Sequence, residues 1–291
     1  MSKELKIGVM VSGGLGLTAL DHIMTSSEVV FVLTDKKSKA IIERAKKNHI
    51  KCFAGNPRNG AVDIFLTKVD EIDVLASMNY LFLIEDNLIS LPKKLAFNIH
   101  GSLLPKYRGR TPHVWAIINN EFEAGVTAHI IEESCDTGDI LKQIIVPIEN
   151  NDTGAMILEK YAEVYPRLID ELLADLKNGA LNPQSQDHSK ATFFGKRTSD
   201  HGEINWDWSK ERIKNWVRAQ AIPYPGAFCY YQGQKVIIDE IQFSEIGYNG
   251  FMKNGLILQT NPLVIKTSNG TIEVKNMRTK MNKFETEQIL Y

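Results

Sequence analysis

The chain has 291 residues, with 34 Lys and Arg against 35 Asp and Glu, which gives a formal net charge of −1. Hydrophobic residues make up 43% of the sequence and charged residues 24%, a composition typical of a globular protein with room for about two domains. The near-neutral balance excludes a protein that binds nucleic acid through a large basic excess. The sequence contains no run of about 18 apolar residues, so we expect no membrane-spanning helix.

The chain start and the cysteines indicate the compartment. The first residues, Met-Ser-Lys-Glu-Leu-Lys-Ile, run directly into a strand pattern and carry no apolar segment of the secretory type. Cys52, Cys135 and Cys229 are far apart and odd in number, which favours neither a disulfide framework nor a zinc site. The histidines show no H-x-x-x-H pairing either. We therefore expect a cytoplasmic protein that holds no metal.

In the first half of the chain, short apolar runs alternate with helical patterns. The predicted strands are Ile7–Val11, Val29–Leu33, Val74–Met78 and Ala96–Ile99. Each of the first two strands is followed by a predicted helix: Leu17–Met24 and Ser38–Asn48. This alternation at βαβ spacing predicts an α/β domain with a mainly parallel sheet that is covered on both faces.

The second half changes character after one long helix. Glu159–Asn178 has apolar residues at three-and-four spacing, and a polar stretch at residues 182–190 follows as a crossover between lobes. Trp208–Ala219 is predicted to be a helix, and the remaining segments are strand-like: Ala227–Tyr231, Lys235–Phe243, Leu256–Thr260, Leu263–Thr267 and Thr271–Met277. We expect two domains, residues 1–185 and a smaller β-rich domain at residues 186–291.

A glycine-rich turn follows the first predicted strand. Gly14, Gly16 and Ala19 open the next helix, and Asp35 stands 21 residues after Gly14, at the end of the second strand. This pattern fits the dinucleotide fingerprint, in which glycines approach a diphosphate and an acid binds a ribose. A doubly wound sheet needs a small-residue turn at this position in any case. An NAD-dependent oxidoreductase therefore remains only an alternative.

A second group of residues can carry acid–base chemistry. Asn98 and His100 are two residues apart at the end of a strand, so their side chains share one face. Asp136 follows 36 residues later, which leaves room for a crossover and a return, and Asp139 is its rival as the acidic partner. The amide can donate to a developing oxyanion, the imidazole can move a proton, and the carboxylate can orient the imidazole. We expect these side chains to meet around one carbonyl group.

These residues carry a family resemblance. Asn-Ile-His-Gly-Ser-Leu-Leu-Pro at residues 98–105, with Asp-Thr-Gly-Asp-Ile at residues 136–140, resembles the formyltransferases that use N10-formyltetrahydrofolate. The resemblance covers roughly residues 5–230. It implies that residues 1–185 form a Rossmann-like catalytic domain that binds no nicotinamide cofactor. It also implies that Asn98, His100 and Asp136 are the catalytic triad.

The resemblance further implies a site for the folate co-substrate. In the family, the folate contacts come from backbone at the edge of the sheet, from the loop after the triad histidine and its arginine, and from the segment before the aspartate. The matching residues here are Phe82, Leu83, Ile84, Leu104, Pro105, Arg110, Glu132, Glu133, Ser134 and Cys135.

Within this family, the chain looks most like the sugar-nucleotide N-formyltransferases. That likeness rests on residues 106–116, Phe193–Arg197 and Pro223–Ala227. It implies a dTDP-linked amino sugar as substrate, with Lys196 and Arg197 neutralising the diphosphate and Tyr224 or Phe194 stacking on the base. The residues expected to bind the substrate are Tyr107, Phe194, Gly195, Lys196, Arg197, Arg218 and Tyr224.

The expected function is therefore formyl transfer to an amino-dideoxysugar for surface polysaccharide such as O-antigen, by a homodimer without nucleic-acid or membrane partners. The preferred acceptor is dTDP-4-amino-4,6-dideoxyglucose, while an amine at C3 stays open. Methionyl-tRNA formyltransferase is the main alternative, but residues 206–291 carry 11 Lys and Arg against 8 Asp and Glu, a weak field for a tRNA. His113 and His129 are expected to be structural histidines, with a sugar contact open for His113.

Overall fold

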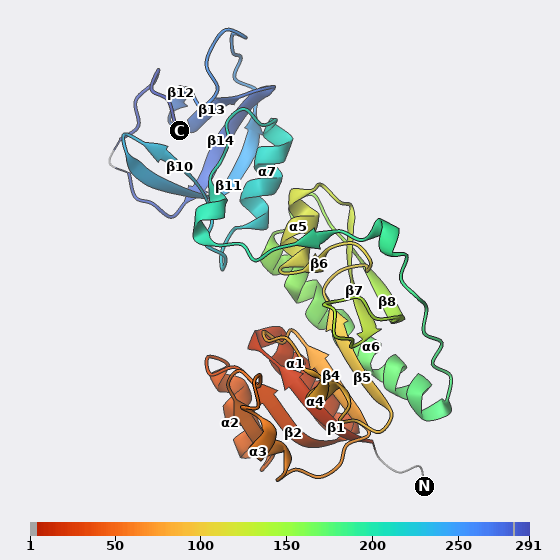
Figure 1. Ribbon diagram of the computed structural model, residues 1–291. Helices are drawn as coiled ribbons and strands as arrows, with labels where there is room; N and C mark the ends of the chain where they lie inside the picture. Colours follow the sequence, from red (N-terminus) through yellow and green to blue (C-terminus); the bar gives the residue numbers. More distant parts are fainter. Residues whose placement is uncertain (1–4, 282) are drawn as a thin grey trace. The chain divides into compact units, whose positions relative to one another are not determined.

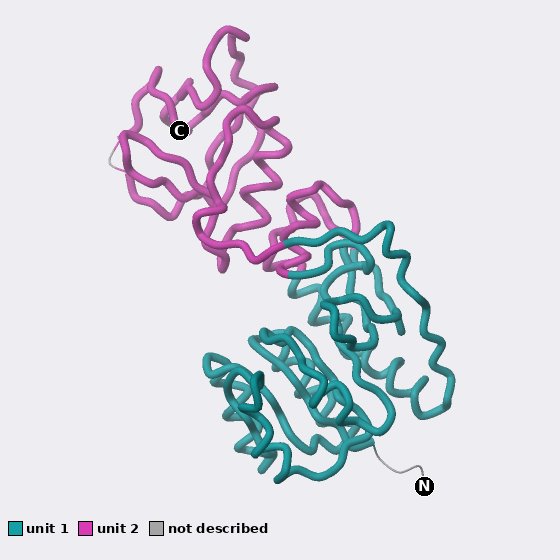
Figure 2. Tube along the Cα trace, viewed as in Figure 1, with its two compact units in different colours: residues 1–109, 124–146, 158–194 teal, residues 110–123, 147–157, 195–291 magenta. Residues whose placement is uncertain are grey.

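The computed structural model describes residues 5–281 and 283–291. The chain divides into two compact units (Figure 2). Unit 1 comprises Met1–Gly109, Ala124–Val146 and Leu158–Phe194, and unit 2 comprises Arg110–Glu123, Pro147–Ile157 and Gly195–Tyr291. The first four residues, on which the expectation about the chain start partly rests, lie outside the described residues. The boundary between residues 185 and 186 stays a prediction.

Unit 1 is built on a seven-stranded sheet of order β3-β2-β1-β4-β5-β7-β8 (Figure 1). Its strands are β1 (Lys6–Val11), β2 (Glu28–Thr34), β3 (Lys51–Ala54), β4 (Val74–Met78), β5 (Leu95–His100), β7 (Glu123–Ile130) and β8 (Ile140–Pro147). Neighbouring strands from β3 to β5 run parallel, and β7 runs antiparallel to β5. The prediction of a Rossmann-like, mainly parallel sheet is confirmed.

The central strands of this sheet, β1 and β4, are apolar because both of their faces are covered. Every residue of β4 is buried, and in β1 all residues after Lys6 are buried, as expected for a central parallel strand. The helices of this part of the chain are α1 (Gly13–Ser26), α2 (Lys39–Lys47), α3 (Asp63–Leu66), α4 (Asp86–Ile89) and α6 (Gly154–Asn178). The order β2-β1-β4 places the topological switch between β1 and β4, where open α/β sheets bind ligands at the carboxyl ends of their strands.

Helix α6 fastens two segments of the sheet through one buried tyrosine. Tyr161 is 1% exposed. Its hydroxyl donates to the carbonyl of Gly101 at 2.9 Å and accepts from the N–H of Gly125 at 3.3 Å. Gly101 directly follows β5, and Gly125 lies in β7. The helix therefore satisfies backbone groups of both strands at the edge where Asn98 and His100 stand.

Unit 2 contains the β-rich domain. Its five-stranded sheet has the order β10-β11-β14-β13-β12, and all of its pairs are antiparallel. The strands are β10 (Ala227–Tyr231), β11 (Gln234–Ser244), β12 (Ile257–Thr260), β13 (Leu263–Thr267) and β14 (Gly270–Met277). Helices α5 (Pro112–Ile118) and α7 (Lys210–Ala219) belong to the same unit. The predicted β-rich carboxyl domain is thus confirmed.

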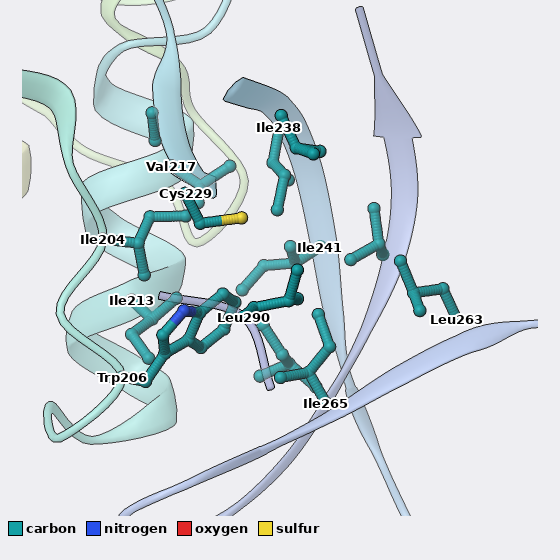
Figure 3. Close-up of a cluster of buried hydrophobic side chains, with 14 of the residues drawn as sticks. Ile204, Trp206, Ile213, Val217, Cys229, Ile238, Ile241, Leu263, Ile265 and Leu290 are labelled. Atoms are coloured by element: carbon teal, nitrogen blue, oxygen red, sulfur yellow. The ribbon is translucent and has the colours of Figure 1, made fainter. Parts of the chain in front are cut away.

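One face of α7 supplies the core of this unit. Figure 3 shows Ile213 and Val217 of α7 packed beside Ile238 and Ile241 of β11, with Leu290 from the chain end. All of these side chains are buried, so the helix and the sheet share one hydrophobic cluster.

The remaining elements are short. A parallel pair joins β6 (Arg108–Gly109) to β9 (Phe193–Phe194), and two 3₁₀ turns lie at His188–Lys190 and Ser199–Gly202. None of the helices in the described part of the chain combines the length and the apolar character that crossing a membrane requires.

The two hydrogen bonds of the Tyr161 hydroxyl predict that removing it destabilises the protein measurably. Tyr161→Phe removes the hydroxyl that binds the half-buried Gly101 carbonyl and the buried Gly125 N–H, so the free energy of unfolding should fall by about 1–3 kcal/mol. Urea denaturation followed by circular dichroism measures this loss. Tyr165→Phe is the matched control, because Tyr165 lies on the same helix and burial is what raises the pKa of its hydroxyl. Equal losses of unfolding free energy in the two variants would contradict this role of the Tyr161 hydroxyl.

Candidate active site

Asn98 and His100 stand at the carboxyl end of β5. They are two residues apart on one strand, and β7 pairs with β5 so that Asn98 lies opposite His129 and His100 lies opposite Thr127. Directly opposed residues of an antiparallel pair present their side chains on the same face. The pairing therefore adds a second imidazole, from His129, to the two side chains that the sequence singled out.

The three predicted catalytic residues meet around His129. The Asp136 Oδ1 atom lies 3.5 Å from His100 Nδ1 and 3.6 Å from His129 Nε2. Asn98 Nδ2 lies 3.1 Å from His129 Nε2. His100, His129 and Asp136 are 7%, 3% and 8% exposed, so the cluster is shielded from bulk water. An amide, two imidazoles and a carboxylate thus lie together in one largely buried cluster.

Backbone carbonyls fix the far side of each imidazole. His100 Nε2 lies 2.8 Å from the carbonyl oxygen of Tyr107, and His129 Nδ1 lies 2.8 Å from that of Ile130. A carbonyl can only accept, so both of these ring nitrogens carry a proton. The nitrogens that face Asp136 are therefore the basic ones. On His100, Nδ1 is the atom that can take up a proton.

Asp136 is held in an unusual backbone conformation. Its φ is 57°, in the left-handed region that aspartate tolerates better than most residues. Gly138, two residues on, passes so close to Ile130 that a Cβ would lie 2.1 Å from that carbonyl oxygen. Gln186 donates from Nε2 to the carbonyls of Asp136 and Gly138 at 3.0 and 2.6 Å. These contacts turn the carboxylate back toward β5.

The other carboxylate oxygen of Asp136 is also bound. Oδ2 accepts from the Gly109 N–H at 2.9 Å and from the Cys135 thiol at 3.3 Å. Gly109 has φ of +99°, and a Cβ there would lie 2.3 Å from the Phe194 carbonyl, so this donor position requires glycine. Asp139, the rival carboxylate, instead contributes its backbone carbonyl to the N–H of Ile130.

Burial and hydrogen bonding set the protonation of the pair. Burial acts to raise the pKa of Asp136, but the neighbouring His100 and the hydrogen bond from the Gly109 N–H hold this pKa below the ordinary aspartate value. Burial lowers the pKa of His100, although Asp136 and the Tyr107 carbonyl oppose that shift. Near neutral pH the carboxylate is therefore ionised beside an imidazole that can accept a proton.

Three residues of this arrangement were not predicted from the sequence. His129 was expected to be structural, and Gln186 lies in the stretch interpreted as a crossover. Arg108 donates from Nη2 to Gln186 Oε1 at 2.6 Å and contacts His188 Nδ1 at 3.0 Å. The useful signal was the alternating segment that forms β7, which would have placed His129 opposite Asn98. Nothing local to Gln186 predicts its contact with a loop 50 residues earlier.

The predicted folate residues come from segments next to β4, Gly109 and Asp136 in the chain. Phe82, Leu83 and Ile84 follow β4, which is the parallel neighbour of β5, so they leave the sheet at the same edge as His100. Leu83 is 52% exposed. Glu132, Glu133, Ser134 and Cys135 form the exposed approach to Asp136, and Arg110 is exposed one residue after Gly109. Their assignment to the folate stays a prediction.

The loop after β5 is fastened to β7 and β8. The N–H of Leu104 donates to Thr127 Oγ1 at 3.2 Å, and its carbonyl accepts from Gln143 Nε2 at 2.9 Å. Leu104 is 3% exposed, while Pro105 is half-buried. The loop that carries both predicted folate residues is thus held by side chains of two strands.

Two predicted substrate residues lie beside the cluster in unit 1. The rings of Tyr107 and Phe194 stack with centroids 5.0 Å apart and planes inclined by 17°. The carbonyl of Tyr107 is the one that binds His100. Gly195 and Lys196 follow as exposed residues. The roles of these four residues in substrate binding stay predictions.

The other predicted substrate residues lie in unit 2. The Arg197 guanidinium lies between two indoles, 4.9 Å from the ring of Trp115 and 4.5 Å from that of Trp216, and Nη2 also donates to Gln220. Burial lowers the pKa of Arg197. These contacts pack the guanidinium among aromatic rings. The prediction that Arg197 binds a diphosphate is left open by them.

Arg218 and Tyr224 also make contacts within unit 2. Arg218 Nη1 donates to the carbonyls of Glu149 and Asp152 at 3.1 and 2.6 Å, and its side chain lines a cavity of about 480 Å³ between α7 and β11. The Tyr224 hydroxyl lies 2.6 Å from His113 Nε2, and burial raises the pKa of Tyr224. Their contacts with a sugar nucleotide stay predictions.

The glycine-rich motif opens α1. Gly14 lies within the first turn of this helix and has open space where a Cβ would stand. The Asp35 carboxylate accepts from the N–H of Lys37 and from the hydroxyl of Ser38. These bonds hold the turn between β2 and α2. The acid of the fingerprint therefore has a local structural role in this turn.

Residues 5–281 and 283–291 contain no group of three or more His, Cys, Asp and Glu side chains placed to hold a metal ion.

Comparison with known proteins identifies the class. The formyl transferase family model matches residues 12–173, and the model of the formyl transferase carboxyl-terminal domain matches residues 196–290. The first match alone spans more than half of the chain and contains the whole cluster around Asp136. The chain belongs to the formyl transferase family and is an enzyme of that class.

Solved structures share the fold. WlaRD, a sugar 3N-formyl transferase solved with dTDP and 5-N-formyl-THF, superposes with a TM-score of 0.71 at 23% identity, over 96% of this chain and 100% of that one. The N-formyltransferase from Helicobacter canadensis, solved with folinic acid and dTDP-3-aminofucose, gives 0.72 at 24% identity, over 93% and 99%. A 4-N formyltransferase from Francisella tularensis gives 0.68 at 23%, over 80% and 96%.

The lowered pKa of Asp136 predicts how stability depends on pH. A carboxylate with a depressed pKa stabilises the fold above its unfolded value, about 3.9, and loses that contribution as the pH falls through the folded value. The difference in unfolding free energy between the native chain and Asp136→Asn should therefore shrink as the pH falls below about 4. Urea denaturation across this range measures it.

Asp139→Asn, which removes a carboxylate from the same loop, is the matched control. A difference between the native chain and Asp136→Asn that stays constant from neutral to acid pH would contradict the assigned shift.

Proposed function

We propose that this formyltransferase moves the formyl group of N10-formyltetrahydrofolate to the amine of a dTDP-linked amino-dideoxysugar. The observation that carries the proposal is the cluster of Asn98, His100 and Asp136, supported by the family match. The cluster contains groups that stabilise charge and move protons. Its neighbouring thiol, from Cys135, is bound to Asp136. This composition favours direct transfer to the amine over an acyl-enzyme.

The site residues fit a formyl donor. A carboxamide has two N–H donors, and His129 takes one of those of Asn98, which leaves the second for a carbonyl oxygen. The exposed Leu83 and half-buried Phe82 leave the adjacent strand at the same edge of the sheet and offer apolar surface for a flat ring. The donor supplies an electrophilic carbonyl carbon and a nitrogen leaving group.

Asn98 and His100 divide the work of the reaction. As the amine bonds to the formyl carbon, Asn98 donates to the oxygen that becomes negative. His100 accepts the amine proton at Nδ1 and returns it to the departing nitrogen, directly or through water. Asp136 stabilises the imidazolium that exists between these two transfers. The Tyr107 carbonyl keeps the ring in the orientation that presents Nδ1.

The acceptor is the finer part of the proposal. We retain dTDP-4-amino-4,6-dideoxyglucose as the preferred substrate, and amines at C3 belong in the same test because the similar structures include enzymes named for either position. The weak charge of the β-rich region, +3 over residues 206–291, disfavours a tRNA acceptor. The proposal extends to a cytoplasmic homodimer that serves surface polysaccharide synthesis.

Removing the oxyanion donor should reduce turnover selectively. We expect Asn98→Ala to lower kcat by about 10²–10³-fold while the Kd for sugar nucleotide changes little, because the amide acts on the reacting carbonyl. Steady-state kinetics and calorimetric titration measure the two quantities. Asn87→Ala, the same change on α4, is the control. Unchanged turnover in Asn98→Ala would remove this residue from the mechanism.

An acceptor panel tests the function as a whole. The native protein is incubated with N10-formyltetrahydrofolate and dTDP- or UDP-linked sugars that bear an amine at C3 or C4, and the products are weighed by mass spectrometry. The proposal requires a gain of one formyl group on a dTDP-linked sugar. Inertness toward every amino sugar, with transfer to initiator methionyl-tRNA instead, would overturn it.

A further inference from the structure

His129 is the buried group of the site to which the proposed reaction assigns no task. It lies on β7, is 3% exposed, and makes its contacts with Asn98, Asp136 and the backbone of Ile130. It stands directly opposite Asn98 across the strand pair. A buried imidazole with this set of partners has its tautomer and orientation set by the groups around it.

The two sides of the ring have different partners. Nδ1 lies 2.8 Å from the Ile130 carbonyl and must donate. Nε2 lies 3.1 Å from the Asn98 amide nitrogen, which is itself a donor. The hydrogen bond is possible only when Nε2 carries a lone pair. The contacts therefore describe a neutral ring that bears its proton on Nδ1.

This neutral ring fixes the carboxamide of Asn98. Because Nε2 takes one of the two N–H groups and the amide is planar, the direction of the second N–H is also set. An oxyanion donor acts only when it points at the position that the charged oxygen will occupy. Building on the proposed function, we infer that His129 is a positioning residue that aims the free N–H of Asn98 at the formyl oxygen.

Asp136 offers a competing partner for the same nitrogen. Its Oδ1 lies 3.6 Å from His129 Nε2, beyond hydrogen-bond distance, whereas the Asn98 contact is 3.1 Å. His100 Nδ1 faces the same carboxylate oxygen at 3.5 Å. Two imidazolium ions sharing one oxygen would repel each other, so the proton that the cluster accepts belongs on His100. His129 Nε2 is already engaged with the Asn98 amide.

Nuclear magnetic resonance tests the tautomer without any substrate. In protein labelled with ¹⁵N-histidine, the His129 ring should show one protonated nitrogen, Nδ1, and one unprotonated nitrogen, Nε2, at neutral pH. The Nε2 resonance should shift in Asn98→Ala, which removes its donor. His129→Asn assigns the signals. A doubly protonated ring, or an Nε2 signal that ignores Asn98→Ala, would overturn the inference.

A pair of variants tests the positioning role. In His129→Asn the shorter amide can reach the Ile130 carbonyl but not Asn98, so kcat should fall by about 10²-fold, the cost of misplacing a reacting group. The KM values for both substrates should stay within about twofold. His129→Gln carries an oxygen near the position of Nε2 and should retain turnover within about tenfold of the native enzyme. Equal losses in the two variants would indicate a structural role.

A double-variant cycle distinguishes Asn98 from Asp136 as the group through which His129 acts. If His129 works through Asn98, His129→Asn should cost almost nothing further in the Asn98→Ala background. Losses that multiply would assign its effect to Asp136 instead and overturn the inference. A protein that formylates no amino sugar would refute the proposed function, while the resonance measurement would still decide the tautomer.

Discussion

The site depends on one buried negative charge. Asp136 is 8% exposed, and a carboxylate removed from water is stable only when other groups replace its hydration. The Gly109 N–H and the Cys135 thiol bind one oxygen, and the two imidazoles face the other. The second oxygen therefore lacks a hydrogen-bond donor until one imidazole takes up a proton. The charge therefore both requires the surrounding structure and favours uptake of a proton by His100.

The strand pairing explains why these groups meet. Register between β5 and β7 sets Asn98 opposite His129, and a slip of β7 by one residue would turn His129 to the other face of the sheet. Tyr161, Thr127 and Gln143 bind backbone groups at the same edge. The rigidity of the sheet is thus transmitted to a loop that would otherwise be free to move. Side chains held in this way need little reorganisation during the proposed reaction.

Much of the fold and part of the site could be predicted from local sequence. The apolar runs marked β1, β2, β4 and β5 to within a residue or two, and the strands of unit 2 were found because turn residues separate them. Strands β3, β7 and β8 were missed because their residues are mixed in polarity, and α1 begins at Gly13 instead of at Leu17 because glycines open it. Asn98 and His100 share a strand face, which period-two alternation reveals directly.

What sequence could not supply is the partnership between distant segments. Asp136 was placed by motif, yet its contact with His100 depends on a left-handed backbone and on a glycine that passes within van der Waals distance of a carbonyl. His129 could be found only by pairing β7 with β5, which the local pattern of either strand does not specify. Gln186 makes its bonds through a polar side chain in a stretch without periodicity. Such contacts are properties of the folded chain, because burial is what makes them favourable.

The contacts of Gln186 indicate that the part of the chain that supports the site extends beyond α6. The first family match stops at residue 173 and the second begins at residue 196. Between them lie Gln186, which binds two carbonyls of the aspartate loop, and Thr192, which accepts from the N–H of Tyr107 and supplies a carbonyl to Arg108. This intervening stretch has the polar composition of a linker, but its hydrogen bonds support the segments around Asp136 and Tyr107. A polypeptide truncated after α6 would keep every reactive side chain and lose the support that aligns them.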